Sequence, residues 1–201
     1  MRLIKIMGLF LLFCVYTYAF EVGKSFHYEN KDKLVVNLTT LDEVHKYFGE
    51  PVRKSEADNV NGHFDIYQYY FVHAGLTDGD ERILLMEFKD KVLIGYVYDS
   101  SHKEDSTLFN YEEAVGIEVG HHINDVVAKV GDPSGEALCP VNIHEYKEKC
   151  LHGKKMLVWI YTPGTSLFGA SSVETKMLFV GLDENSLVTD VSHHVLVGDG
   201  E

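Results

Sequence analysis

Two segments of the chain share one spacing of apolar residues. In residues 40–51 (TLDEVHKYFGEP) and 122–133 (HINDVVAKVGDP), apolar side chains stand at positions i, i+3 and i+7. This spacing predicts a short amphipathic helix in each segment. Both helices are expected to end at a glycine followed two residues later by proline, because glycine accepts the left-handed cap and proline cannot continue the helix.

Strand patterns follow each predicted helix. Residues 66–72 (IYQYYFV) and 157–162 (LVWIYT) are rich in aromatic and β-branched residues, and residues 86–97 and 180–191 each match a strand, a polar turn and a second strand. We therefore expect an α+β fold of two tandem repeats, each a short helical segment packed on a three- to four-stranded antiparallel meander sheet. A further helix is predicted around residues 107–115.

The two predicted repeats divide the chain between them. We expect repeat 1 over residues 20–105 and repeat 2 over residues 106–201. Repeat 2 has about ten extra residues between its helix and its aromatic strand, which predicts an insert at residues 134–156. Cys139 and Cys150 both lie in this insert. An even number of cysteines in an oxidising compartment predicts a disulfide between them, with two free thiols as the alternative.

The first residues have the pattern of a cleavable signal peptide. Residues 1–19 combine a basic start, an apolar run and small residues before a predicted cleavage between Ala19 and Phe20. The apolar run is shorter than the roughly 20 residues that span a bilayer, so we expect no membrane span. Phe13 precedes Cys14 where a lipoprotein signal needs a small residue, which argues against a lipid anchor. The mature chain is therefore expected to be periplasmic or secreted.

Charge restricts the class of partner. Cleavage at the predicted site removes two of the 18 Lys and Arg residues and none of the 31 Asp and Glu residues. Nucleic acid is excluded as an expected partner, because phosphate binding depends on clustered Lys and Arg. An acidic surface either favours the capture of a basic protein or only keeps an exported chain dispersed.

The repeat motif resembles a known family. A helix that ends in V-x(4)-G-x-P, followed by an aromatic strand and a hairpin, is similar to the SmpA/OmlA (BamE-like) family of bacterial envelope proteins. Two such units in one exported chain resemble the secreted β-lactamase inhibitor proteins more closely. The resemblance implies a protein-binding role and no enzymatic activity. The residues that carry it in the two copies are Val44, Gly49, Pro51 and Tyr67, and Val126, Gly131, Pro133 and Trp159.

Comparison of the two copies suggests which aromatic side chains lie on the open face of the sheet. Tyr96 and Tyr98 align with polar residues of repeat 2, which predicts that both are exposed. The same comparison places Tyr70 on the open face, and Phe168 at the tip of a glycine- and serine-rich loop. These four residues are the candidate protein-binding residues. The alternative is that the repeats or a loop cover this face. Four aromatic side chains are expected to point inward: Tyr67, Tyr69, Trp159 and Tyr161.

No sequence motif indicates catalysis. The chain lacks a nucleophile elbow, a P-loop, a dinucleotide fingerprint and a zincin motif. The adjacent pairs His121-His122 and His193-His194 are poor chelators, because neighbouring side chains diverge on a helix or a strand. We therefore expect no enzymatic activity, no cofactor, no catalytic residue and no metal site. The expected function is an exported protein-binding module, such as an inhibitor of another protein. The alternatives are a BamE-like envelope assembly or structural factor, and a metal or small-ligand carrier.

Overall fold

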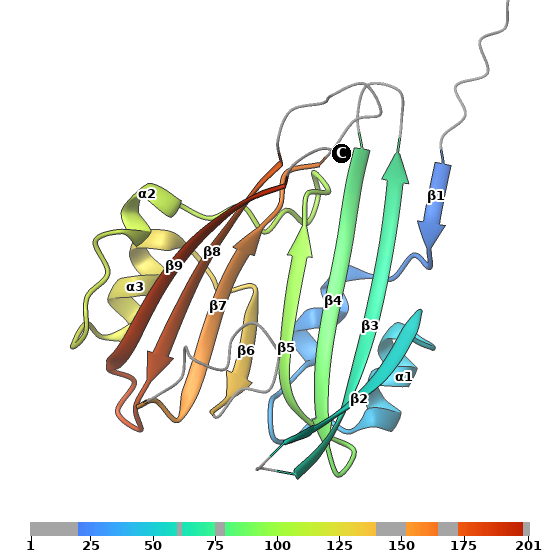
Figure 1. Cartoon of the computed structure of the whole chain (residues 1–201), viewed down its shortest axis with the longest axis horizontal. Coiled ribbons are helices and arrows are strands. Elements are labelled where there is room, and N and C mark those ends of the chain that lie inside the picture. The colour runs from blue at the N-terminus through green and yellow to red at the C-terminus, as the bar shows by residue number, and fades with distance from the viewer. Residues whose placement is uncertain (1–19, 60–61, 75–78, 140–151, 165–172, 199–201) are drawn as a thin grey trace, which may run out of the picture.

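One antiparallel sheet runs through both halves of the chain (Figure 1). The computed structural model describes residues 20–59, 62–74, 79–139, 152–164 and 173–198. The strands are β1 (Phe20–Gly23), β2 (Arg53–Asn59), β3 (Gly62–Ala74), β4 (Gly79–Lys89), β5 (Val92–Ser100), β6 (Gly135–Leu138), β7 (Lys155–Tyr161), β8 (Val173–Leu182) and β9 (Val188–Gly198). Their order in the sheet is β1-β3-β4-β5-β6-β7-β8-β9, and β2 also pairs with β3.

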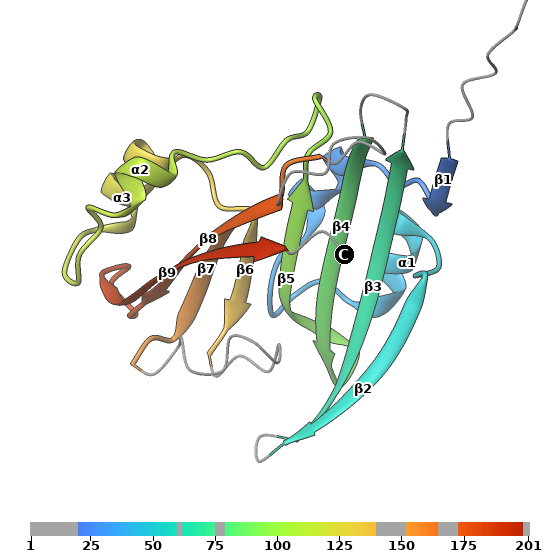
Figure 2. The same cartoon turned by 45° about the horizontal axis from the view of Figure 1, so that its top comes forward.

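The helices all lie on one face of this sheet. They are the 3-10 helix η1 (Tyr28–Lys33) and the α-helices α1 (Leu41–Phe48), α2 (Tyr111–Ala114) and α3 (Ile123–Val130). In Figure 1 the strands pass in front of the helices, so that view looks onto the helix-free face, and Figure 2 shows the helices from a second angle. In the described part of the chain, no helix is long and apolar enough to cross a bilayer.

The ends of α1 and α3 agree with their sequence signals. The Thr40 Oγ1 accepts from the backbone N–H of Glu43 at 3.4 Å, and the Glu43 carboxylate accepts from the backbone N–H of Thr40 at 2.8 Å. These reciprocal hydrogen bonds form a capping box at the start of α1. Gly49 and Gly131 follow the two helices with φ angles of 75° and 96°, a region that favours glycine. The predicted helix ends are therefore confirmed.

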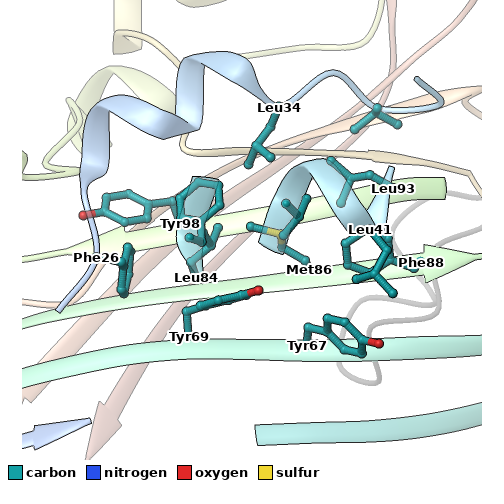
Figure 3. Packing of buried hydrophobic residues seen from close by; sticks show 13 residues of the cluster. Phe26, Leu34, Leu41, Tyr67, Tyr69, Leu84, Met86, Phe88, Leu93 and Tyr98 are labelled. Atoms are coloured by element: carbon teal, nitrogen blue, oxygen red, sulfur yellow. The ribbon is translucent and has the colours of Figure 1, made fainter. Parts of the chain in front are cut away.

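Two hydrophobic clusters lie between the sheet and the helices. The first joins α1 and the residues on either side of η1 to β3, β4 and β5 (Figure 3), and the second joins α2 and α3 to β7 and β8. Tyr67, Tyr69 and Trp159 are buried in these clusters and Tyr161 packs against the second, so the inward orientation predicted for all four is confirmed. The buried residues of the first cluster are Phe26, Leu34, Val36, Leu41, Val44, Phe48, Tyr67, Tyr69, Leu84, Met86, Phe88, Leu93 and Tyr98.

A seam between β5 and β6 joins the two halves of the sheet. A Cβ atom at Gly95 would lie 2.8 Å from the Cβ atom of Ala137, and one at Gly135 would lie 2.5 Å from the carbonyl oxygen of Tyr96. Both positions therefore need glycine for the close approach of the two strands. A third cluster of buried residues covers this seam on the helix-free face: Val97, Ala137, Met156, Val158, Met177 and Phe179.

The fold is α+β and is dominated by antiparallel sheet. Each of the helices α1 and α3 is followed by a meander of four strands, because β2 and β6 stand between the helix and the aromatic strand. The sequence reasoning did not place β2 and β6. Strand β6 lies inside the range 134–156 that was expected to be an insert. Helix α2 is shorter than the predicted helix around 107–115.

Candidate protein-binding surface

Tyr98 is buried, so its predicted exposure is wrong. Its side chain is 1% exposed and packs in the first hydrophobic cluster on the helix side of the sheet. Tyr96 lies on the same side and is half-buried against that cluster. Neither tyrosine therefore stands on the helix-free face, where the comparison of the two copies had placed them.

The error has a cause in strand register. Tyr98 of β5 pairs with Leu84 of β4, and His193 of β9 pairs with Leu178 of β8. Four residues separate the paired Phe88 and Leu93, whereas five separate the equivalent pair Leu182 and Val188. Because of this extra residue, Tyr98 corresponds to His193 and not to Ser192. A slip of one residue moves a side chain to the other face of a strand.

The Tyr98 hydroxyl belongs to a buried polar cluster around Asp105. It donates a hydrogen bond to the Asp105 carboxylate, and burial raises the pKa of Tyr98, which keeps the phenol protonated. Arg82 contributes two hydrogen bonds to the same carboxylate, from Nε at 2.7 Å and from Nη2 at 3.3 Å. The Ser100 Oγ donates to it at 3.3 Å. Asp105 therefore holds the segment after β5 against β4 and β5.

Two further carboxyl groups, those of Glu81 and Asp99, lie beside this cluster. Burial raises the pKa of Glu81 from its ordinary value of 4.5 to about 7, and the charge of Asp99 adds to the shift. Burial also raises the pKa of Asp99. Asp99 Oδ1 accepts from the backbone N–H of Thr162 at 3.0 Å and from the Thr107 hydroxyl at 3.1 Å. Asp99 thus connects β5 to the segment that follows β7.

The other predicted site residues are divided between the described and the remaining parts of the chain. Tyr70 is half-buried, and the alternation along β3 places it on the face opposite Tyr69. Its backbone oxygen accepts from the backbone N–H of Lys24 at 3.0 Å. Cys139 follows β6, and its backbone N–H donates to the Lys154 oxygen at 3.0 Å.

Three of the predictions depend on residues outside the described ones. Phe168, Cys150 and Ala19 all lie there. Phe20, expected to begin the mature chain, is the first residue of β1. The loop contact, the disulfide and the signal cleavage all stay predictions.

The strongest candidate surface lies on β9, at one edge of the sheet (Figure 1). Among the described residues, β9 pairs with β8 on one side and no strand pairs with its other side. Near its end, Val195, Leu196 and Val197 are 43%, 50% and 53% exposed. Residues 191–198 include no Asp, Glu, Lys or Arg. Edge strands of soluble proteins are usually protected by charge, proline or a covering segment.

A pocket adjoins this strand on the helix side. Its volume is about 410 Å³, and its lining includes Glu174 and Lys176 of β8. These two residues pair directly with Val197 and Val195 in the β8–β9 ladder. The remaining lining residues are Leu108, Phe109, Asn110, Tyr111, Glu112, Tyr161 and Pro163. We call residues 195–197 together with this pocket the edge surface.

Sequence reasoning missed the edge surface, although one signal was available. In the predicted meander the last strand pairs with the strand before it on one side, which already made it a candidate edge. The run Val195-Leu196-Val197 follows the strand predicted within residues 180–191, and residues 191–198 include no Asp, Glu, Lys or Arg. An apolar run at a predicted edge is a recognisable mark of a contact surface.

The adjacent histidines point away from each other. The His193 ring contacts Tyr111 on the helix side at a centroid distance of 6.4 Å. His194 contacts Phe179 on the other face at 6.0 Å, and its Nε2 lies 2.9 Å from the Ser192 hydroxyl. At the start of α3, His122 accepts from the backbone N–H of Asn124 as a helix cap. The two imidazoles of the pair on β9 therefore do not converge on one ion.

Comparison with solved structures finds a similar fold. No protein-family model and no curated protein sequence matches the chain, so the resemblance to the SmpA/OmlA family stays a prediction. The fold is similar to the crystal structure of a candidate β-lactamase inhibitor protein from Streptococcus mutans, with 12% sequence identity and a TM-score of 0.44. The similarity covers 85% of this chain and 98% of that chain.

Proposed function

We propose that this chain is an exported protein-binding module, built from two diverged copies of one helix-and-meander unit. It binds an extended segment of another protein along β9. The single observation that carries this proposal is the edge of β9, which no described strand pairs with and which presents exposed apolar side chains beside a pocket. An extended segment that adds to a sheet edge gains backbone hydrogen bonds along its length, and pockets for alternate side chains select its sequence.

The charge of the molecule defines the chemistry of the partner segment. The chain has a formal net charge of −13, whereas residues 191–198 are uncharged apart from two histidines. An acidic partner would be repelled by the molecule as a whole. We therefore expect a segment without acidic residues that places one apolar side chain in the pocket beside Tyr111 and Tyr161. This partner is an enzyme if the module acts as an inhibitor, and an envelope component if it acts in assembly.

The proposal of binding without catalysis agrees with the structural roles of the buried carboxyl groups. The oxygens of Asp105 accept from Arg82, Tyr98 and Ser100, and Asp99 accepts from Thr162 and Thr107. These carboxyl groups are engaged in holding the chain together. We include in the proposal the disulfide between Cys139 and Cys150, which would close the segment between β6 and β7.

Affinity capture tests the proposal. The purified chain is immobilised and exposed to envelope extract and culture fluid of the native host. The parent is compared with a double variant, Val195→Lys with Val197→Lys, that adds charge to the edge surface. Leu38→Lys is the matched control, because Leu38 is an exposed apolar residue away from β9. We expect one partner to be retained by the parent and by the control and lost by the double variant.

A Tyr70→Ala variant separates the edge surface from the helix-free face. Retention of the same partner by Tyr70→Ala agrees with binding at β9. Loss with Tyr70→Ala and retention by the double variant would transfer the site to the helix-free face. Retention by every variant would contradict the proposal.

A further inference from the structure

Four polar side chains form a compact group on the hairpin of β2 and β3. Glu56 is directly opposite Asp65 in the ladder, and Asp58 is directly opposite His63. The His63 Nδ1 lies 2.9 Å from Asp58 Oδ1. The His63 Nε2 lies 4.0 Å from Glu56 Oε2 and 3.8 Å from Asp65 Oδ1. One ligand atom from each of Glu56, His63 and Asp65 falls within 4.8 Å of the other two.

In the described part of the chain, the carboxylates of this group outnumber the cationic group that pairs with them. Two carboxylates placed directly opposite each other in a ladder are destabilising. Among the described residues, the only cationic group recorded against Glu56, Asp58 and Asp65 is the His63 imidazole. The nearby Lys54 is engaged with Glu50 at 3.1 Å and lies over the Tyr67 ring. The ion pairs of these three carboxylates in the described part of the chain therefore share one imidazole.

We propose that Glu56, His63 and Asp65 bind a divalent transition-metal ion, with Zn²⁺ as the best fit. One imidazole nitrogen and two carboxylate oxygens are a donor set that zinc accepts, whereas Ca²⁺ and Mg²⁺ take oxygen ligands. The sequence had led us to expect no metal site, because adjacent histidine pairs do not chelate. This site combines one histidine with a carboxylate of the same strand and a carboxylate of the neighbouring strand. The combination can be recognised only when the register of β2 on β3 is known.

The observed separations are close to those between the ligands of a zinc site. Ligand atoms at zinc distances of about 2.0–2.1 Å lie roughly 3.3 Å apart in a tetrahedron. The His63 Nε2 distances of 3.8 and 4.0 Å exceed this by less than 1 Å. They are also too long for hydrogen bonds. Glu56 is exposed and Asp65 is half-exposed, so both carboxylates have room to rotate towards an ion.

Asp58 is a positioning residue for this site. Its carboxylate accepts from His63 Nδ1, which fixes the tautomer and leaves the Nε2 lone pair directed at Glu56 and Asp65. Metal-binding histidines commonly donate their second N–H to a carboxylate in this way, and loss of that carboxylate weakens metal binding by about 10- to 100-fold.

Zinc titration tests the site. Isothermal titration of the purified chain with zinc chloride is compared across the parent and the variants His63→Ala, Glu56→Gln and Asp65→Asn. We expect each variant to lose one zinc equivalent that the parent binds. Asp58→Asn is expected to keep that equivalent with an affinity about 10- to 100-fold lower. The matched control is His73→Ala, because His73 lies on the same strand and its ion pair is with Glu21, away from Glu56 and Asp65.

The ¹⁵N chemical shift of His63 Nε2 distinguishes a zinc ligand from a residue with only a structural role, because only a ligand changes its shift when zinc binds. We expect zinc to shift this resonance in the parent and in His73→Ala. Unchanged zinc stoichiometry in His63→Ala, or a parent that binds no zinc, would overturn the proposal. The two carboxylate variants keep the test valid if His63→Ala does not fold. The site lies on the hairpin of β2 and β3, far in sheet order from β9, so its result is independent of the partner-capture experiment.

Discussion

Asp105 shows at the scale of single residues how this chain uses its buried charge. Its side chain is 3% exposed, and the carboxylate accepts hydrogen bonds from Arg82, Tyr98 and Ser100. The sequence placed Tyr98 at an interface, whereas the structure places it in this cluster. A buried carboxylate is tolerated only when donors satisfy it, which explains why three side chains converge on it.

Replacement of Asp105 by Ala is predicted to destabilise the fold. The change leaves the largely buried Arg82 guanidinium without its partner, and breaking such a pair costs about 3–5 kcal/mol. Urea denaturation measures the change in the free energy of unfolding. Glu104→Gln is the control, because Glu104 is the exposed neighbour and should change stability by less than about 0.5 kcal/mol. Equal effects of the two substitutions would contradict the assigned role.

Glu81 gives the molecule a pH dependence near neutrality. Its folded pKa of about 7 lies above the ordinary value of 4.5, so the folded state binds the proton more tightly than the unfolded state does. Stability is therefore expected to fall as pH rises from about 5 to 7 through this group. Glu81→Gln should reduce that loss, measured as the difference in unfolding free energy between pH 5 and pH 8. Glu174→Gln, at an exposed position, should leave the difference unchanged.

At the scale of elements, the helix ends were predictable because their signals are local. A glycine and a proline within three positions are sufficient to end α1 and α3, whatever the helices pack against. The faces of β5 were not predictable in the same way. The prediction aligned β5 with β9 to decide which residues face the helices. One extra residue in the turn before β9 shifted this alignment, so Tyr96 and Tyr98 were assigned to the wrong face.

The helix stop at Gly131 can be tested without changing any packing. Its φ angle is 96°, and a Cβ atom there would meet no atom within 4 Å, so Gly131→Ala acts on the backbone alone. We expect a loss of about 1 kcal/mol in unfolding free energy. Gly116→Ala is the matched control, because Gly116 lacks a positive φ and its nearest atom would lie at 3.6 Å. A neutral Gly131→Ala would contradict the proposed helix stop.

At the scale of the whole molecule, the β5–β6 seam makes one sheet of two halves. The sequence predicted two repeats and left their relative orientation open, since pairing between distant strands has no local signal. In the structure the close approach depends on Gly95 and Gly135, at positions where a side chain would meet the opposite strand.

The seam predicts cooperative unfolding of both halves. Trp159 is the single tryptophan and reports on the second half, whereas far-ultraviolet circular dichroism reports on the entire sheet. We expect the two denaturation curves of the parent to coincide. Gly135→Ala should lower stability by about 1–3 kcal/mol, because its Cβ would lie 2.5 Å from the Tyr96 oxygen. Separate transitions in the parent would show that the halves unfold independently.

The edge surface also belongs to the scale of the whole molecule. Eight of the strands form a single series that ends at β9. Among the described residues, no strand pairs with the outer edge of β9, so its backbone there is open to a segment of another chain. The most direct measurement of this claim is amide hydrogen exchange of the chain, free and bound to the captured partner. We predict slower exchange along residues 189–198, with little change in β3 around Tyr70. Slower exchange confined to β3, with β9 unchanged, would contradict the assignment of β9 as the binding edge.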